Sequence, residues 1–569
     1  MTDIDLRNAG YALDRRTLLA SASALFLGGC VHCADMKAFP LVRTGQTLIG
    51  DAHAHLFNAA DLPVAGFLKY VLLPEYLPRL KPLWPALIAL SKSLKGLAIS
   101  AEAEARQLFD ERRKEAEPVA PARYADTIAD EIEARTSPAG RAAALADKEA
   151  ATETDSFTAL AAVIDSAAGG PTGRNDPGVA QSGGAGSLLI DRRFLERVAV
   201  EGAGAVFADG RSEAMRADVV PDAAGGDFAV LWNGIKWLYD MVQPRCKHVH
   251  TYLATMANPH THTDRIVNLL IDYDAWLGDS AASGSGIEQQ LLYWTRYARS
   301  AQGRLAVETF APYDPLRHVE ERLKGPTGRD VLADVRRWAS GGPGSPIAIS
   351  GFKLYPPMGF SAAGNSGPPV SNRGGAQVIQ RWTKNKWPLE RCGALIEDAL
   401  DTFFALCAEY DMPVIAHARD SNEASDCAGK KADPKFWLHR VKAMDRPLRI
   451  SLGHFSPDDF GEQIYRDVLA YNRTGPSRIS FDLSYSEAIL NGKAEELLDH
   501  VARLCRAEDP DCQSFVFGTD WIMLGREPQA PRYIQHLWDA MEGRDFWKGP
   551  ARDNLLHANL DRFLRRRGL

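Results

Sequence analysis

The chain of 569 residues is 45% apolar and 24% charged, a composition typical of a folded globular protein rather than of a disordered or fibrous one. Its net charge of −7, and the lack of any basic run beyond the arginines at 565–567, argue against nucleic acid as a partner. The length suits several average domains, or a single barrel that carries insertions.

Residues 1–35 have the features of an export signal. A twin-arginine pair, Arg15 and Arg16, precedes an uncharged stretch of apolar and small residues at 18–29 that is too short to span a bilayer. The stretch ends at Cys30, in a sequence that resembles a lipoprotein cleavage box. We therefore expect the export machinery as a partner and a periplasmic location, or a lipid anchor to the membrane through Cys30. A plain signal peptide is the alternative to the anchor.

The remaining cysteines give weaker signals. Cys30 and Cys33 have the spacing of a metal half-site or a redox pair, but their position at the signal junction favours processing. Cys505 and Cys512 are close enough in sequence to form a disulfide in an oxidising compartment. We interpret the other cysteines as core thiols.

Eight short apolar runs, each followed by a turn and then by helix-like sequence, indicate parallel strands joined by helical crossovers. This pattern predicts an α/β fold of the (β/α)8 barrel type; a doubly wound open sheet is the alternative, although no glycine-rich phosphate loop follows any of the runs. The predicted strands are residues 47–55, 267–274, 304–310, 347–355, 412–418, 448–455, 478–483 and 514–521.

The long gap between the first two predicted strands indicates an insertion. We expect the barrel to comprise residues 47–60 and 265–569, and the mainly helical insertion to comprise residues 61–264. Within the insertion, residues 169–186 are rich in glycine and proline and are predicted to be flexible. Because the insertion leaves the barrel after the first strand, it emerges on the catalytic face. We predict a cap over the pocket, with a partner-binding helical layer as the alternative.

Two histidines close the first predicted strand in the sequence Asp51-Ala52-His53-Ala54-His55. The alternation of side chains along a strand places His53 and His55 on one face, as half of a metal site. The chain contains two similar pairs, at residues 248 and 250 and at residues 260 and 262. The pair at 260 and 262 precedes the second predicted strand, and hence lies at the end of the barrel opposite the catalytic face.

Other strand ends carry the same kinds of metal ligand. His417, His454 and Asp520 lie at the ends of the fifth, sixth and eighth predicted strands. Each residue alone is better explained as a hydrogen-bonded histidine or a helix-capping aspartate. Since the carboxyl ends of all barrel strands meet at one face, five such residues together predict a metal site.

Here the chain resembles the amidohydrolase superfamily, in particular the amidohydrolase-related group that includes aminocarboxymuconate semialdehyde decarboxylase. The resemblance covers roughly residues 47–60 and 265–565 and is strongest at residues 51–58, at the two later histidines and at residues 518–521. It implies that His53, His55, His417 and Asp520 bind one divalent ion, and that His454 binds a second ion or acts on the substrate. Lys353 would be either a carboxylated lysine that bridges two ions or an ammonium that orients an anionic substrate.

The residue types suit hydrolysis. Neutral imidazoles and one carboxylate leave an open metal position for water, and Asp520 is placed to take up the water's proton as a general base, with His454 as the second catalytic candidate. Arg419 is a candidate to bind a substrate carboxylate, although a surface salt bridge explains it equally well. The candidates for the pocket wall are Tyr355, Trp521 and Met523, which packing at the barrel rim also explains.

The sequence therefore predicts a metal-dependent hydrolase that cleaves a C–N or C–O bond in a small amide, lactone or ester. The expected cofactor is one or two divalent ions, zinc first, with manganese or iron as alternatives. Two other functions stay open: a non-oxidative decarboxylase on the same scaffold, and an exported metal-binding protein without activity.

Overall fold

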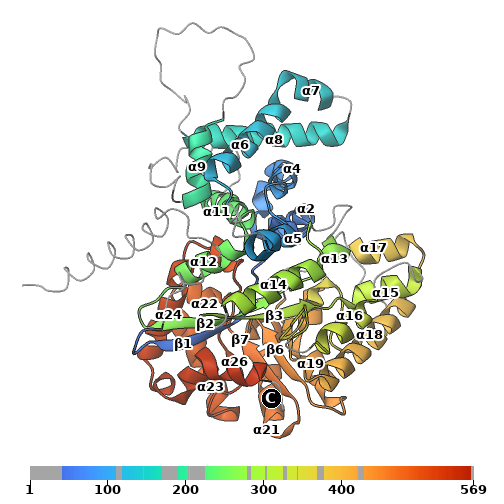
Figure 1. Ribbon diagram of the computed structural model, residues 1–569, viewed down its shortest axis with the longest axis vertical. Coiled ribbons are helices and arrows are strands. Elements are labelled where there is room, and N and C mark those ends of the chain that lie inside the picture. The colour runs from blue at the N-terminus through green and yellow to red at the C-terminus, as the bar shows by residue number, and fades with distance from the viewer. Residues whose placement is uncertain are drawn as a thin grey trace, which may run out of the picture.

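The computed structural model describes most of the chain beyond its N-terminal segment (Figure 1). The predicted export signal with Arg15, Arg16 and Cys30, and the glycine-rich segment at 169–186, lie outside the described residues. The described ranges are residues 42–110, 118–144, 147–168, 190–202, 204, 225–277, 284–301, 304–324, 330–341, 344–367, 377–420 and 428–565.

Eight parallel strands follow one another around a sheet in the order β1 to β8, and helices lie between them. The (β/α)8 barrel predicted from the alternating pattern is therefore confirmed. The strands are β1 (Thr47–Ala54), β2 (Thr261–Leu269), β3 (Ala306–Pro312), β4 (Gly351–Leu354), β5 (Val414–His417), β6 (Arg449–Gly453), β7 (Arg478–Asp482) and β8 (Phe515–Val516).

The segment after β8 closes the barrel against β1. The Ala52 amide donates to the Phe517 carbonyl at 2.9 Å, and the Asp520 amide donates to the His53 carbonyl at 2.7 Å. A parallel bridge also joins Ala54 to Trp521. This closure brings the first and the last strand ends together, and these ends carry three of the predicted ligands.

The end of the barrel at which the strands begin is filled by apolar side chains and closed by the C-terminal helix α26 (Asn559–Leu564). Ala52, Val267, Phe310 and Val516 form a buried cluster with Leu560 and Phe563 of this helix. The Phe563 ring stacks on that of Phe310, with centroids 6.3 Å apart. Packed side chains therefore fill this end of the barrel. A binding site is expected at the opposite end, where the strands finish.

Helices surround the barrel, and several begin at a side-chain cap. Asp330 and Asp433 accept hydrogen bonds from the first turns of α16 and α19, which satisfies backbone amides that have no partner within the helix. Besides α26, the barrel helices are α13 (Asp274–Leu277), α14 (Ile287–Ala301), α15 (Pro315–Lys324), α16 (Val331–Ala339), α17 (Gln377–Lys384), α18 (Leu389–Glu409), α19 (Pro434–Lys442), α20 (Pro457–Phe460), α21 (Glu462–Thr474), α22 (Glu487–Leu490), α23 (Ala494–Glu508), α24 (Tyr533–Glu542) and α25 (Pro550–Asp553).

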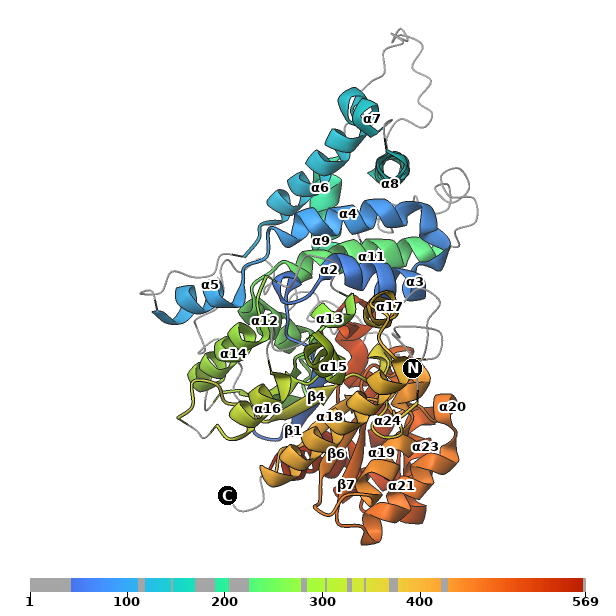
Figure 2. The same ribbon diagram turned by 90° about the vertical axis from the view of Figure 1, so that its right-hand side faces the viewer.

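The insertion between β1 and β2 is helical and rises from one end of the barrel, with α12 nearest to the strands and α7 farthest away (Figures 1 and 2). Its last helix leads directly into β2, which begins at residue 261 and ends at residue 269, earlier at both ends than predicted. The helices are α2 (Val64–Phe67), α3 (Leu73–Tyr76), α4 (Trp84–Lys95), α5 (Ala101–Ala105), α6 (Pro121–Thr136), α7 (Pro138–Ala144), α8 (Lys148–Ala168), α9 (Arg192–Glu201), α11 (Gly225–Met241) and α12 (Arg245–Thr255).

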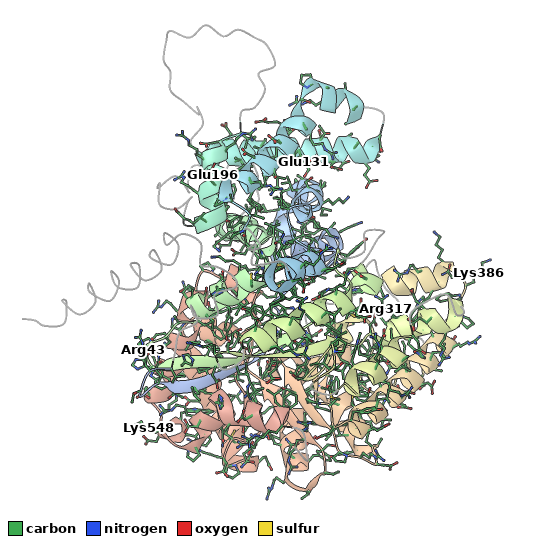
Figure 3. All side chains as sticks on the ribbon, viewed as in Figure 1. Arg43, Glu131, Glu196, Arg317, Lys386 and Lys548 are labelled. Atoms are coloured by element: carbon green, nitrogen blue, oxygen red, sulfur yellow. The ribbon has the colours of Figure 1, made fainter. Side chains whose placement is uncertain are left out.

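Two further features concern the molecular surface and membrane-spanning helices. Charged side chains such as Lys386 and Lys548 lie at the periphery of the molecule (Figure 3). Within the described ranges, every helix is too short or too polar to cross a bilayer.

A buried ionic cluster ties the insertion to the barrel. Arg245 of α12 is fully buried; it donates to Asp61 just after β1 and to Glu104 of α5. The bonds measure 2.8 Å from Nε to Asp61 Oδ2 and 2.8 Å from Nη1 to Glu104 Oε2. Tyr293 of barrel helix α14 donates to the other oxygen of Glu104 at 2.6 Å. One guanidinium therefore links the start, the middle and the end of the insertion.

We predict that Arg245→Met lowers the free energy of unfolding by about 3–5 kcal/mol, because two buried carboxylates lose their counter-charge. Chemical denaturation of the purified chain measures the change. Arg337→Met, which removes an exposed guanidinium from α16, is the control and should change stability by less than about 1 kcal/mol. Equal stability of the two variants would show that the cluster does not hold the insertion in place.

Candidate metal centre

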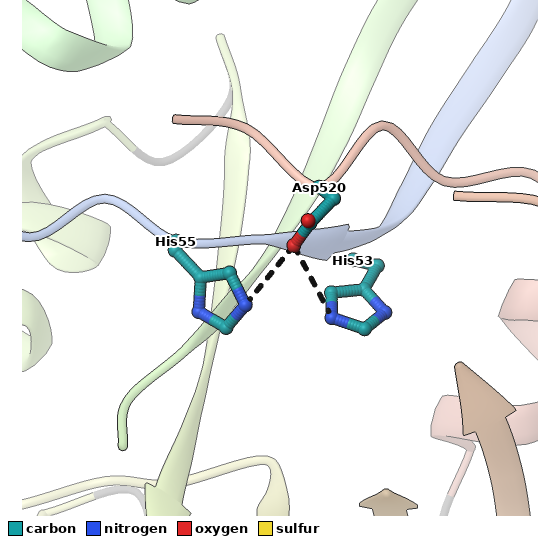
Figure 4. Close-up of side chains that lie close together, drawn as sticks. All are labelled: His53, His55 and Asp520. Carbon is teal, nitrogen blue, oxygen red and sulfur yellow. Dashed lines mark ion pairs between the residues drawn. The ribbon is translucent and has the colours of Figure 1, made fainter. Parts of the chain in front are cut away.

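Three predicted ligands converge where β1 meets the end of β8 (Figure 4). His55 Nε2 lies 3.2 Å from Asp520 Oδ1, and His53 Nε2 lies 3.6 Å from the same oxygen. All three residues are buried. Among the residues that the structure describes, Asp520 Oδ1 has no hydrogen-bond partner, and a buried carboxylate oxygen is costly without one. His53, His55 and Asp520 can therefore hold a metal ion.

A change in strand register brings His53 into the barrel. Gly50 approaches Leu560 of α26 and Ala52 belongs to the interior cluster, so strict alternation would direct residue 53 outward. The pairing of β1 with β2 shifts between Asp51 and Ala54, and His53 then reaches side chains of β4 and β7. Both histidines thus reach Asp520, as predicted, but the simple two-residue period does not extend through Asp51.

The other nitrogen of each β1 histidine has its own partner. His53 Nδ1 donates to Asp482 Oδ2 at 2.8 Å, and His55 Nδ1 donates to the Leu269 carbonyl at 2.7 Å. These bonds place the proton on Nδ1 and leave the lone pair of Nε2 toward Asp520. Metal-binding histidines are oriented in this way.

Asp482 and Ser484, at the end of β7, connect a second histidine to the first. His454 Nδ1 lies 3.0 Å from Ser484 Oγ, and that hydroxyl donates to Asp482 Oδ1. The His454 amide donates to the same carboxylate at 2.9 Å. Side-chain atoms of His53, His454 and Asp482 form a second group that can hold a metal ion.

The remaining predicted ligands lie next to these groups. Lys353, buried at the end of β4, places Nζ 3.1 Å from His53 Nε2. The His417 ring lies 4.6 Å from the His454 ring, and the latter lies 4.6 Å from the His53 ring. All six predicted metal ligands therefore gather at one end of the barrel.

Burial and neighbouring charges favour the ligand forms of these side chains. Burial lowers the pKa of His53 to about 3, and the Lys353 charge acts in the same direction while Asp482 opposes it. Burial also lowers the pKa values of His417 and His454 below the usual histidine range. For Asp520, burial opposes ionisation, but the close contact with His55 and the other nearby imidazoles outweigh it and lower the pKa to about 2. Neutral imidazoles beside an ionised carboxylate form a donor set that suits a divalent ion.

Two glycines make room for His53. A Cβ atom at Gly453 would lie 2.6 Å from His53 Cε1, and one at Gly518 would lie 3.0 Å from His53 Cβ. A side chain at residue 453 would collide with the His53 ring, and one at residue 518 would fit only if its neighbours shifted. The glycines that precede His454 and Asp520 in the strand-end motifs therefore have a packing role at the site.

Two ligand candidates have a left-handed backbone conformation, His454 with φ of 65° and Asp520 with φ of 61°. Residues other than glycine seldom adopt this conformation, and where they do the surroundings must hold them. At Asp520 the amide bond to His53 contributes to this constraint.

The predicted substrate-binding residues have different surroundings. The Tyr355 ring lies 4.8 Å from that of His417, beside the site. Trp521 is buried, with its ring 5.8 Å from Tyr252 of α12. Arg419 is part of a salt bridge to Glu487 at 3.0 Å, which matches the surface alternative of the prediction.

The other histidine pairs lie away from the site. His248 and His250 belong to α12, and His262 lies in the first part of β2 rather than before it, because that strand begins at residue 261. His260 stacks on Trp538 at 5.3 Å. The start of β2 is nevertheless the end of the barrel opposite the ligands, as predicted.

The cysteines within the described ranges are either free thiols or disulfide-bonded. Cys505 and Cys512 are buried free thiols with their sulfurs 2.8 Å apart, and the disulfide between them stays a prediction. Cys392 and Cys407 are buried thiols, as expected, whereas Cys246 is disulfide-bonded and is not the core thiol that we expected.

Sequence reasoning missed Asp482, Ser484 and Asp51. Asp482 and Ser484 stand at a predicted strand end, which is the same signal that identified the ligands, but a strand-end aspartate also caps helices. Asp51 belongs to the recognised motif, yet its role depends on Thr519 and Tyr252, which are distant in sequence.

We predict that Asp482→Asn weakens zinc binding about 10- to 100-fold, because an amide cannot hold the His53 proton as a carboxylate does. Competition with a chromophoric chelator measures the affinity. Asp561→Asn, in helix α26 at the other end of the barrel, is the matched control and should bind zinc as the wild type does. Equal affinity of both variants would contradict the orienting role of Asp482.

No protein-family model, curated protein or solved structure matches this chain.

Proposed function

We propose that the chain is a metal-dependent hydrolase of the amidohydrolase type that cleaves a C–N or C–O bond in a small amide, lactone or ester. The observation that carries this proposal is the convergence of the His53 and His55 imidazoles on Asp520 Oδ1, an oxygen without a hydrogen-bond partner among the described residues. Such a donor set at the carboxyl ends of barrel strands is suited to a catalytic ion. We propose zinc as the resident ion, with manganese or iron as alternatives.

A divalent ion held by these residues would lower the pKa of water toward neutrality and polarise the bond that the water attacks. The chain's own side chains supply the proton transfer. Asp520 is ionised, and its Oδ2 is not shared with the two imidazoles, so this oxygen would accept the proton of the attacking water and return it to the leaving group. His454, with its Nδ1 held by Ser484, would present Nε2 to the substrate or to a second ion.

Lys353 decides how many ions the site holds. Its Nζ faces His53 Nε2 at 3.1 Å, so an unmodified ammonium and a divalent cation would compete for the same nitrogen. A carboxylated Lys353 would instead supply oxygen ligands, with His417 and His454 completing a second position. An uncarboxylated Lys353 that gives up His53 Nε2 to the metal would leave one ion and a cation that orients an anionic substrate.

The function is tested by assaying zinc-loaded protein against ester, lactone and amide substrates. We expect His55→Ala to lose bound zinc together with at least about 100-fold of the activity, because the ion that activates the water is no longer held without this ligand. The matched control is His260→Ala, which removes an exposed histidine at the opposite end of the barrel and should keep both.

Three outcomes would contradict the proposal. Release of carbon dioxide from carboxylate substrates without uptake of water would identify a decarboxylase on the same scaffold. A zinc-loaded chain that is inert on all the substrates would favour a metal-binding protein without activity. Activity that persists in His55→Ala would exclude His55 as a ligand of the working site.

We also propose that the chain is exported by the twin-arginine route and reaches the periplasm, with a lipid anchor at Cys30. The sequence of residues 1–35 supports this proposal. Replacing Arg15 and Arg16 together with lysine should leave the precursor in the cytoplasm, as followed by cell fractionation and immunoblotting. A variant that still appears in the periplasm at the wild-type level would rule out the route.

A further inference from the structure

Asp51, the first residue of the motif, does not lie among the metal ligands but accepts four hydrogen bonds. Its Oδ1 accepts from the amides of His53 at 2.9 Å and Thr519 at 3.1 Å. Its Oδ2 accepts from Thr519 Oγ1 at 2.5 Å and from the Tyr252 hydroxyl at 2.9 Å. The carboxylate is fully buried, so these donors are its means of solvation.

Three of the four bonds come from residues that are ligands or that adjoin one. His53 is a ligand on β1, and Thr519 immediately precedes the ligand Asp520. The Asp520 amide in turn donates to the His53 carbonyl. Asp51 therefore fixes the separation of the two chain segments whose ligands must meet at one oxygen.

The fourth bond comes from the insertion. Tyr252 belongs to α12, is fully buried, and packs its ring edge-on against Trp521 at 5.8 Å. A second insertion helix reaches the same segment, because Trp237 Nε1 of α11 donates to the Ile522 carbonyl at 3.2 Å. Figure 1 shows α12 lying between the barrel and the outer helices of the insertion. The insertion thus contacts the segment at 519–522 that holds Asp520.

We propose that Tyr252 is a positioning residue of the metal centre. Its hydroxyl completes the solvation of Asp51, which holds His53 and Asp520 at the separation that metal binding requires. The insertion is then part of the support of the centre. This inference rests on the metal site of the proposed function but not on the bond that the site cleaves.

Tyr252→Phe in the full chain is the test, because phenylalanine keeps the ring against Trp521 and removes only the hydroxyl. The matched control is Tyr124→Phe in α6, which removes another fully buried hydroxyl of the insertion, one that donates to the Ile235 carbonyl at 2.7 Å. Zinc affinity is measured by chelator competition, and the ligand field is measured by visible absorption of the cobalt(II)-loaded protein. Thermal unfolding of the metal-free chains compares their stability.

We expect Tyr252→Phe to bind zinc about 10-fold more weakly and to shift the cobalt(II) absorption bands, while Tyr124→Phe matches the wild type in both. In an Asp51→Asn background, Tyr252→Phe should cause no further loss, because the hydroxyl acts through that carboxylate. If Tyr252→Phe does not fold, Asp51→Asn alone must show the weakened affinity and the shifted bands.

Wild-type affinity and an unchanged cobalt(II) spectrum in folded Tyr252→Phe would overturn the inference, as would equal losses in both tyrosine variants. These results leave the proposed function intact. Conversely, a wild-type chain that binds metal but hydrolyses no substrate fails the proposed function without affecting the role of Tyr252. A wild-type chain that takes up neither zinc nor cobalt overturns both.

Discussion

The structure depends on one carboxylate oxygen that two imidazoles share. Asp520 Oδ1 is buried and faces the Nε2 atoms of His53 and His55, both of which carry lone pairs because their protons are on Nδ1. Three electron-rich atoms that face one another in a buried space favour a cation beside them; the Lys353 ammonium lies 3.1 Å from His53 Nε2, and the three atoms together can hold a metal ion. The need to hold these three atoms together accounts for the features around them: the Asp482 bond that fixes the tautomer of His53, the left-handed backbone at Asp520, and the glycines that make room for the His53 ring.

Closure of the barrel and formation of the site are the same event in this chain. The ligands on β1 and after β8 lie far apart in sequence and meet only when the strand ends pair. Backbone hydrogen bonds between residues 52–54 and residues 517–521, together with the Asp51 carboxylate, join the two strand ends; we call this region the joint. The long insertion leaves the barrel next to the joint and returns along it through α12, and the buried Arg245 cluster holds its two ends together. A large insertion is therefore compatible with a precise site, because its inner helices contact the joint.

The fold was predictable because eight apolar runs alternate with helical sequence, and few folds bury eight such strands with helices between them. The start of β2 was misplaced because its first residues, with His262 and Asp264, are polar, and a strand end at the barrel rim need not be apolar. The ligand candidates were found because they lie at the ends of predicted strands. Asp482 lies at such an end too, but it supports a histidine through a contact that spacing does not reveal. The partnership of Tyr252 with Asp51 needs the closed barrel, since 201 positions separate the two residues.

The most direct test of the metal centre is anomalous X-ray diffraction from crystals of the zinc-loaded chain, with data collected on both sides of the zinc absorption edge. The structure predicts an anomalous peak bounded by His53 Nε2, His55 Nε2 and Asp520 Oδ1. A second peak beside Lys353, His417 and His454 would show that the centre holds two ions. A zinc-loaded crystal with no peak among the three atoms would contradict the assignment of this site as the metal centre.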